Sequence, residues 1–266
     1  MSFSIEGKTA IVTGAANGVG CAIGRHFVDQ GANVMFVDMD EEGLINELGA
    51  ANDADNMRYF AGDLREKLTI ANLLSATIDQ FDQVDILVNA CRQVLVTDPL
   101  GVDDDTTEIM LQQNLLNSLR LSQLVARRMI KQAAGNTESQ VGSIINMSSI
   151  AARRAHPDLM AYSIATAACD QMTRSLAVAL APHKIRVNAV AFGSVMSASL
   201  QEALKANADF RGDIEDHTPL HRIASPRELA AAVQYLASDW SGFMTGQIMT
   251  LDGGRTLIDP VAAPAH

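Results

Sequence analysis

Apolar residues along this chain alternate between short continuous runs and longer segments with a helical pattern. The short runs predict β-strands at Thr9–Thr13, Asn33–Val37, Met57–Ala61, Val84–Val88, Ser143–Met147, Ile185–Ala191 and Gln247–Leu251. The first, second, fourth and sixth runs are almost entirely apolar, which is typical of strands that helices cover on both faces. The segments between them predict helices near Gly18–Gln30, Glu41–Leu48, Glu66–Gln80, Thr107–Gln132, Met160–Ala181 and Pro226–Ser238.

This alternation of strands and helices predicts an α/β fold, a doubly wound parallel sheet (Rossmann-like) of about seven strands with helices on both faces. The chain has no linker, repeat or low-complexity tract, so we expect a single domain over residues 1–266. Two stretches lack a regular pattern: 132–141, interpreted as a surface loop, and 193–223, an irregular stretch interpreted as a lid. The tail after Asp259 is expected to be weakly ordered.

A glycine-rich segment with the spacing G-x-x-x-G-x-G follows the first predicted strand. Gly14 permits a tight turn, Gly18 lets the backbone approach a pyrophosphate, and Gly20 lets the helix pack close to the strand. The N–H groups at the helix start would then face the phosphates. We therefore predict that Gly14, Asn17, Gly18, Val19 and Gly20 bind a dinucleotide; the alternative is a tight turn without a ligand.

Asp38 ends the second predicted strand, 24 residues after Gly14. A carboxylate there can accept hydrogen bonds from both hydroxyls of an adenosine ribose, and it repels a 2′-phosphate. No arginine or lysine follows until Arg58. The pattern favours NAD over NADP as cofactor, the alternative being that Asp38 only caps a helix. Asp63 and Leu64, after the third strand, are placed for contact with the adenine edge.

With further motifs, the chain resembles the classical short-chain dehydrogenase/reductase family over nearly its whole length, about residues 5 to 257. Beyond the glycine loop, the matching motifs are Asp63, Asp85–Asn89 (DILVN), Asn114, Ser148–Ser149, Tyr162, Ile185–Val190 (IRVNAV), Pro219–Leu220 and Leu251–Gly254 (LDGG). The resemblance implies a seven-stranded parallel sheet, a nicotinamide cofactor across the carboxyl ends of the strands, and a homotetramer.

In this family a tyrosine exchanges a proton with the substrate while hydride moves between the nicotinamide and a carbonyl carbon. The resemblance assigns Tyr162 as this acid/base, Ser149 as the serine that orients the oxygen, and Asn114 as the asparagine that holds a proton-relay water. The lysine that grips the nicotinamide ribose, four residues after the tyrosine, is Thr166 here. Further cofactor contacts implied are Asn89, Gly193 and Val195.

Two more departures lie near the expected nicotinamide. The family's N-N-A-G reads Asn89–Arg92 (NACR), and its proline-glycine reads Phe192-Gly193. A free tyrosine titrates near about 10, so losing a lysine that lowers this by about two to three units costs roughly 3–4 kcal/mol. Thr166 can donate a hydrogen bond to the ribose but cannot supply the charge. We predict that Arg92 replaces the lysine; the alternative is that Arg92 points into solvent and the site is inactive.

Charge and cysteine content exclude several partners. The formal net charge of −11 disfavours duplex nucleic acid and anionic membrane surfaces. Cys21, Cys91 and Cys169 lack metal-ligand spacing, so we expect free thiols, no metal and, without a secretory signal or a membrane span, a cytoplasmic protein. The resemblance implies that the apolar helices Thr107–Gln132 and Met160–Ala181 form a dimer interface and that the segment Leu251–Leu257 makes a second one, in a homotetramer or homodimer.

Two interpretations of function stay open. The first is an NAD(H)-dependent oxidoreductase, with a modified catalytic site, that interconverts a small alcohol and a ketone or other carbonyl substrate; Ser149 and Tyr162 favour it. The second is a catalytically silent NAD-binding protein, a sensor or a partner subunit, which Thr166 and Arg92 favour. Between Ser149 and Tyr162, where the family shapes its substrate pocket, two arginines and a histidine either attract a carboxylate or phosphate substrate or simply face solvent; they are Arg153, Arg154 and His156.

Overall fold

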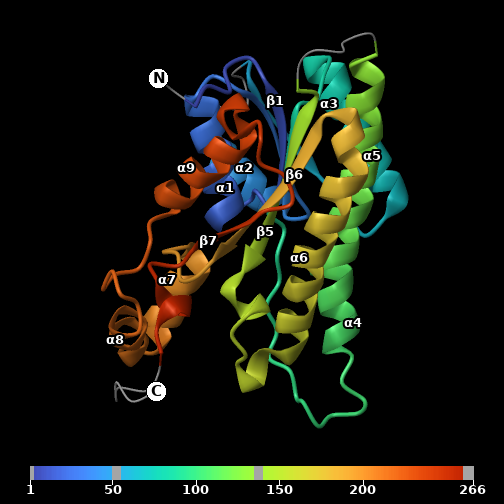
Figure 1. The fold of residues 1–266 in the computed structure, drawn as a ribbon. Helices are drawn as coiled ribbons and strands as arrows, with labels where there is room; N and C mark the ends of the chain where they lie inside the picture. Colours follow the sequence, from blue (N-terminus) through green and yellow to red (C-terminus); the bar gives the residue numbers. More distant parts are fainter. Residues whose placement is uncertain (1–2, 50–54, 135–139, 260–266) are drawn as a thin grey trace.

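The computed structural model describes residues 3–49, 55–134 and 140–259, and seven strands in these ranges form one parallel sheet. The strands are β1 (Thr9–Thr13), β2 (Asn33–Asp38), β3 (Met57–Ala61), β4 (Ile86–Asn89), β5 (Gly142–Ser149), β6 (Ile185–Phe192) and β7 (Ile248–Leu251). Their order across the sheet is β3-β2-β1-β4-β5-β6-β7 (Figure 1). The predicted doubly wound parallel sheet is thereby confirmed.

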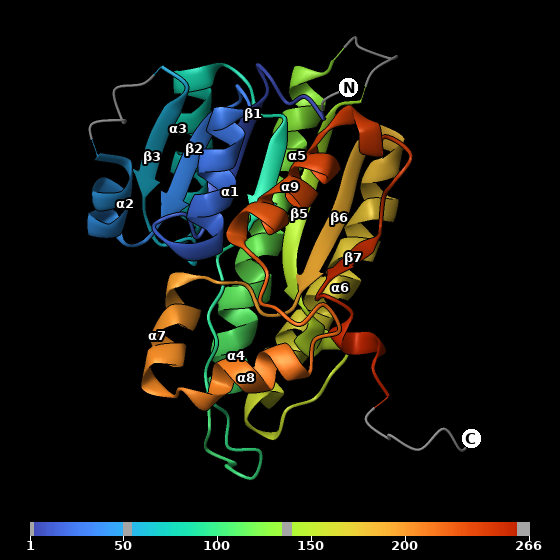
Figure 2. The same ribbon diagram turned by 90° about the vertical axis from the view of Figure 1, so that its left-hand side faces the viewer.

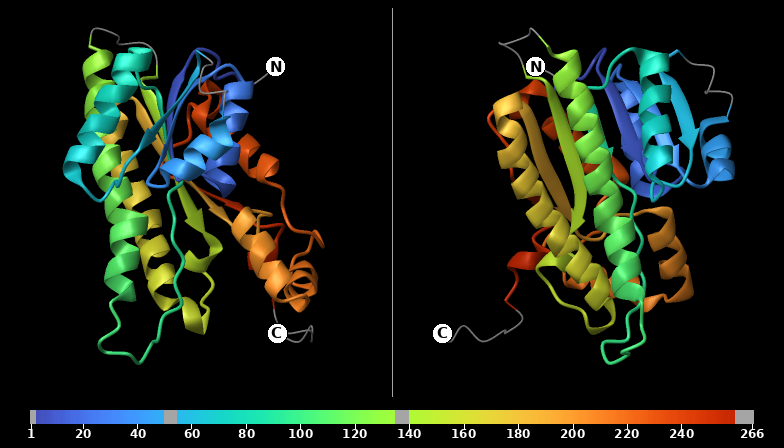
Figure 3. Two further views of the ribbon diagram at one scale, coloured as in Figure 1. Left: turned by 180° about the vertical axis from the view of Figure 1, so that it is seen from behind. Right: turned by 90° about the vertical axis from the view of Figure 1, so that its right-hand side faces the viewer.

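Helices cover both faces of this sheet. Those described are α1 (Gly18–Asp29), α2 (Glu41–Leu48), α3 (Lys67–Phe81), α4 (Thr106–Leu111), α5 (Asn117–Gln132), α6 (Met160–Leu180), α7 (Ala198–Ala206), α8 (Asp209–Asp216) and α9 (Pro226–Ala237). Helices α1, α2 and α9 lie on one face (Figure 2), and α3, α5 and α6 lie on the other (Figure 3).

Side-chain alternation along the strands builds a separate hydrophobic core on each face. In β1, Val12 packs with Phe27 and Val233 beneath α1 and α9, whereas its neighbour Ile11 packs with Leu73 beneath α3. Every residue of β1, β4 and β6 is buried, because these strands lie inside the sheet with helices above and below. Burial on both faces explains why these strands are almost continuous apolar runs in the sequence.

Two sequence expectations need correction. Segment 193–223 is not irregular: it contains α7 and α8, which lie beyond the carboxyl ends of the strands (Figure 2). Neither helix has a buried residue, so neither has the apolar stripe by which a helix is recognised in a sequence. The predicted helix Thr107–Gln132 is interrupted by the π-helical turn η2 (Gln112–Leu116).

Parts of two other expectations lie outside the described residues, namely positions 135–139 of the predicted surface loop and positions 260–266 of the tail. Among the described helices, none is both long enough and apolar enough to cross a membrane.

The strand order changes direction between β1 and β4. From β1 the chain proceeds to β2 and β3 on one side, and then returns to β4 on the other side. In open α/β sheets the crevice beyond the carboxyl ends of the strands at such a point is where ligands bind. The two cavities described next open at this end of the sheet.

Candidate active site

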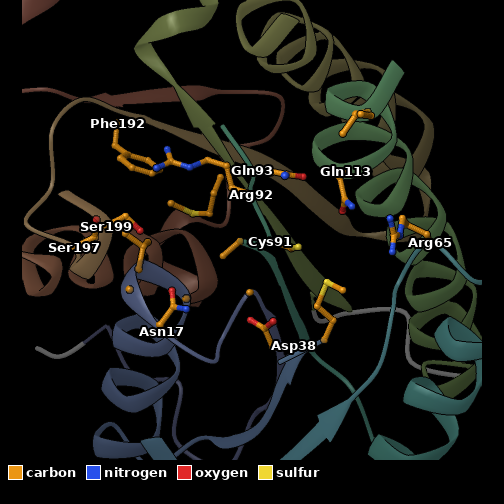
Figure 4. A pocket seen from close by; sticks show the side chains of 18 residues that line it. Asn17, Asp38, Arg65, Cys91, Arg92, Gln93, Gln113, Phe192, Ser197 and Ser199 are labelled. Carbon is orange, nitrogen blue, oxygen red and sulfur yellow. The ribbon is translucent and has the colours of Figure 1, made fainter. Parts of the chain in front are cut away.

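The first cavity has a volume of about 600 Å³ and lies at the carboxyl ends of β1, β2 and β4 (Figure 4). Many of the residues predicted from the sequence to contact a dinucleotide meet here. They are Gly14, Asn17, Gly18, Val19, Gly20, Asp38 and Arg92.

The glycine loop fits a pyrophosphate. At Gly14 the backbone has φ +65°, and a Cβ would lie 2.7 Å from Cys91 Cα, so only glycine allows this turn. At Gly18, by contrast, the nearest atom to a Cβ would be Ser197 Cβ at 3.8 Å, which leaves space for a ligand against the backbone. The first turn of α1 has no acidic residue, so its N–H groups present an uncompensated positive end.

Asp38 is fixed against this loop. Its Oδ2 accepts a hydrogen bond from Ala16 N at 3.1 Å, and its Oδ1 accepts one from Asp40 N at 3.2 Å. Because the carboxylate also lines the cavity, it presents a negative group close to the glycine turn. This is the arrangement expected of a group that binds ribose hydroxyls and repels a 2′-phosphate.

Arg65 is a lining residue that the sequence did not identify. Its Nη2 lies 2.5 Å from Asp63 Oδ2, and its guanidinium holds the pKa of Asp63 below the usual value for an aspartate. Asp63 is thus committed to Arg65 and does not line the cavity. Leu64 is buried in the core beneath α3 and α5.

Asn89 lies inside the protein beneath the site. Its Nδ2 donates to Ser122 Oγ at 2.9 Å and to Asn146 Oδ1 at 2.8 Å. Asn146 in turn donates to Thr173 Oγ1 at 2.9 Å. This buried network joins β4 and β5 to α5 and α6, so the Asn89 side chain holds the strands together and does not line the cavity.

The second cavity, of about 500 Å³, lies at the carboxyl ends of β5 and β6 and contains the predicted catalytic pair. Tyr162, in the first turn of α6, is 3% exposed, and Ser149, at the end of β5, is 7% exposed. Ser149 Oγ accepts a hydrogen bond from Ala151 N at 3.1 Å. Phe192 lines both cavities, so one aromatic ring stands between the two sites.

Arg92 reaches Tyr162 from the end of the neighbouring strand β4. Its Nη1 donates a hydrogen bond to Tyr162 Oη at 3.1 Å, and its Cζ lies 4.7 Å from the centre of the Phe192 ring. Arg92 follows β4 and Phe192 ends β6, so the side chain crosses the carboxyl end of β5 (Figure 4). No carboxylate forms an ion pair with Arg92 in the described part of the chain, and its charge is directed at the phenol and the ring.

Thr166 is directed away from both cavities. Its Oγ1 donates to the backbone carbonyls of Tyr162, at 2.9 Å, and Ser163, at 3.1 Å, within α6. The residue is 3% exposed. A threonine that bonds back to its own helix has its single proton in use. Where the family has a lysine, this chain therefore has a hydroxyl group that is bonded to the backbone of its own helix.

Asn114 lies in the π-helical turn η2 and is bound to the segment that carries Arg92. Its Oδ1 accepts from Gln93 N, and its Nδ2 donates to Gln93 O, both at 2.8 Å. These two bonds hold the backbone next to Arg92 in place. The extra residue of a π turn shifts a side chain out of the regular helical register, and such turns are frequent at functional sites.

Gly193 ties the start of segment 193–223 to the sheet, and Val195 ties it to Ala224, just beyond the end of the segment. Gly193 N donates to Leu251 O at 3.0 Å, and Val195 forms a parallel bridge with Ala224. Gly193 lines the second cavity, whereas Val195 is buried. Ser197, which caps α7 by accepting from Leu200 N, lines the first cavity together with Ser199. The sequence around these two serines has no pattern that indicates a ligand. The one signal it offers is that Ser197 is a favourable helix N-cap residue.

Cys91 also lines the first cavity. Burial, together with the nearby carboxylates of Asp38 and Asp63, raises the pKa of its thiol to about 11. The three cysteines are free thiols. Within the described ranges, no group of three or more His, Cys, Asp or Glu side chains is placed to hold a metal ion.

Comparison with known proteins gives matches over nearly the whole chain. A family model described as enoyl-(acyl carrier protein) reductase matches residues 14–256. The 2,3-dihydroxy-2,3-dihydro-p-cumate dehydrogenase of Pseudomonas putida is 31% identical over 256 residues, 96% of each protein. An NAD-dependent glycerol dehydrogenase of Listeria innocua is 29% identical over 255 residues, again 96% of each. A solved short-chain type dehydrogenase/reductase from Mycobacterium marinum has a TM-score of 0.83 at 26% identity and covers 97% of this chain and 100% of its own.

Proposed function

Because this chain belongs to the short-chain dehydrogenase/reductase family, we propose that it is an NAD(H)-dependent oxidoreductase that interconverts a small alcohol and a ketone by hydride transfer. The observation that carries the proposal is the hydrogen bond from Arg92 Nη1 to Tyr162 Oη at 3.1 Å. A cation in contact with the proposed acid/base supplies from β4 what the family's lysine would supply from α6.

The first cavity would hold the cofactor. The glycine loop and the amino end of α1 would bind the pyrophosphate, and Asp38 would bind the adenosine ribose and select NAD against NADP. Ser197 lines the same cavity and belongs to segment 193–223, which we interpret as a lid. When bound, the nicotinamide would accept a hydride from the alcohol carbon or return it to the carbonyl carbon.

The chain's own residues would handle the proton. Tyr162 Oη takes the hydroxyl proton during oxidation and returns it during reduction, while Ser149 Oγ donates a hydrogen bond to the substrate oxygen. Arg92 stabilises the tyrosinate but cannot relay a proton, because a guanidinium stays charged at every working pH. Asn114 positions Arg92 through its two bonds to Gln93.

Several properties of the protein are part of the proposal. Two relatives are dehydrogenases named for hydroxyl-bearing compounds, a dihydroxy-dihydro-cumate and glycerol, which supports a small alcohol as substrate. We also propose a homotetramer or homodimer in the cytoplasm, where free thiols such as these are maintained. The partner is a small molecule and neither nucleic acid nor a membrane, in keeping with the net charge of −11.

One observation favours the second candidate, a catalytically silent NAD-binding protein. Arg92 packs on Phe192 across the end of β5, where the family places the nicotinamide, and so stands between the two cavities. If this contact stays closed, the adenosine half of the dinucleotide would bind while its nicotinamide half would find no place. Such a protein would sense the nucleotide without oxidising anything.

Calorimetric titration with NADH, NADPH and ADP-ribose, beside a turnover screen of secondary alcohols and ketones, separates the two candidates. For an oxidoreductase we expect NADH to bind at least tenfold more tightly than NADPH, and more tightly than ADP-ribose, with turnover of some substrate. ADP-ribose lacks the nicotinamide ring, so equal affinity for ADP-ribose and NADH, with no turnover across the screen, would overturn the oxidoreductase in favour of the silent protein.

A further inference from the structure

The second cavity has basic side chains from three separate parts of the chain. Arg154 and His156 come from the loop after β5, His217 follows α8, and Arg255 begins the short turn η7 (Arg255–Leu257) after β7. None of the described residues that line this cavity is Asp or Glu. The chain as a whole has 31 acidic and 20 basic residues, so the sign of the charge in this cavity opposes that of the protein.

The two histidines already face carboxylates outside the cavity wall. His156 Nδ1 lies 3.9 Å from Asp158 Oδ2, and His217 Nδ1 lies 3.2 Å from Asp213 Oδ1. Any positive charge on these rings is therefore largely balanced by a neighbour. The cavity's uncompensated charge must come from the arginines.

Arg154 and Arg255 are held by neutral groups only. Arg154 Nη2 donates to the backbone carbonyl of Thr256, and Arg255 Nη1 donates to Ser194 Oγ at 3.3 Å. Neither guanidinium pairs with a carboxylate within residues 3–49, 55–134 and 140–259. Each has five N–H donors, most of which stay available. The hydrogen bonds fix both side chains at the cavity wall without neutralising them.

The neighbouring Arg153 shows that this placement is specific. Its Nη1 donates to Thr250 Oγ1 at 2.9 Å, and it does not line the cavity. The side chains of these two adjacent arginines thus lie in different places, and only that of Arg154 lines the cavity that contains Ser149 and Tyr162. Arg154 and Arg255, which lie about a hundred residues apart in the sequence, both line this one cavity.

We propose that the substrate is a small hydroxy or keto compound with an anionic group, a carboxylate or a phosphate, which Arg154 and Arg255 bind. A cavity of about 500 Å³ suits a small molecule. Guanidinium groups pair with carboxylates and phosphates through two parallel hydrogen bonds, which gives orientation as well as affinity. With its anionic end on the arginines, such a substrate presents its carbinol or carbonyl carbon to Tyr162 and Ser149. The inference rests on the proposed function for the role of that pair.

Binding without turnover tests the anionic site directly. Acetoacetate and its neutral analogue pentane-2,4-dione form one pair of probes, and dihydroxyacetone phosphate and dihydroxyacetone form the other. Each ketone is titrated calorimetrically into the protein, with and without saturating NAD, which cannot reduce a ketone. We expect at least one anionic probe to bind tenfold or more tightly than its neutral partner, and the pair that shows this tells carboxylate from phosphate.

Variants assign the effect to the two arginines. Arg154→Gln and Arg255→Gln should each lower the anionic preference severalfold, and the double variant should abolish it, whereas the matched control Arg153→Gln should retain it. Unchanged thermal unfolding shows that each variant is folded. Equal binding of both members of each pair, or a preference that survives in the double variant, overturns the proposal. A preference for anions in a protein that turns over none of the probes with NADH leaves this proposal standing and counts against the proposed function instead.

Discussion

Replacing Arg92 with alanine removes the guanidinium that donates to Tyr162 Oη at 3.1 Å. Thr166 cannot substitute for it, because its hydroxyl is bonded to backbone carbonyls of α6. The tyrosinate formed during alcohol oxidation would lose the cation that contacts it. The expected effect is therefore on the rate of the chemical step more than on substrate binding.

The size of the effect follows from the kind of bond removed. A hydrogen bond to a charged group contributes about 1.5–3 kcal/mol, which corresponds to roughly a 10- to 150-fold loss in kcat.

Steady-state kinetics on the alcohol with the highest turnover provide the assay. Arg92→Lys should retain more activity than Arg92→Ala, and adding Thr166→Lys to Arg92→Ala should restore at least part of the loss by returning the family's cation. Arg227→Ala, at an exposed arginine of α9 that lines neither cavity, is the control for charge alone. If Arg92→Ala keeps kcat within twofold of the parent, Arg92 has no part in catalysis.

Three further outcomes are expected. Asp38→Ala should reduce the preference for NADH over NADPH to near unity, because Asp38 is the cavity-lining carboxylate that we propose binds the adenosine ribose. Equal affinities in the parent protein by fluorescence titration would contradict this. Cys91 should react with iodoacetamide about a hundredfold more slowly at pH 8 than an ordinary thiol, because its raised pKa keeps the thiol protonated until the pH approaches 11. Mass spectrometry of the labelled peptide measures the rate. Fast labelling at pH 8 would show an exposed thiolate instead. Light scattering at micromolar concentration should give a dimer or tetramer formed through α5 and α6, where Ile164 and Val178 are 44% and 78% exposed on the single chain; a monomer would refute the interface.

The elements that bury apolar surface were predictable from the sequence, and those that do not were missed. Every residue of β1 and β4 is buried, so a continuous apolar run identifies each strand. Helices α7 and α8 have no fully buried residue, so the same reasoning gives them no signal. The π turn η2 was missed for a different reason, because one added residue barely alters the hydrophobic pattern of a long helix.

The candidate site divides in a similar way. Gly14, Gly18 and Asp38 were found because their spacing reflects a local turn and a strand end. Arg65 was missed because its place at the cavity depends on the fold, although its ion pair with Asp63 is only two residues away. The contact of Arg92 with Tyr162 spans 70 residues. The position of Arg92 just after a predicted strand made this contact conceivable, but its geometry could be seen only in the structure. The same is true of the two bonds by which Asn114 holds Gln93.

The ring of Phe192, shared by both cavities, affects how affinity and rate are related. In the proposed oxidoreductase, Arg92 would have to leave this ring, while keeping its bond to Tyr162, for the nicotinamide to reach the substrate. A cation–π contact made by an exposed arginine is stabilising by about 0.5–1 kcal/mol. That energy would offset part of the cofactor's binding energy, so the proposed enzyme would bind its cofactor about two- to fivefold more weakly than a pocket already open. Under this proposal one residue both speeds the reaction and weakens cofactor binding, and selection for tighter NAD binding at position 92 would produce a slower enzyme.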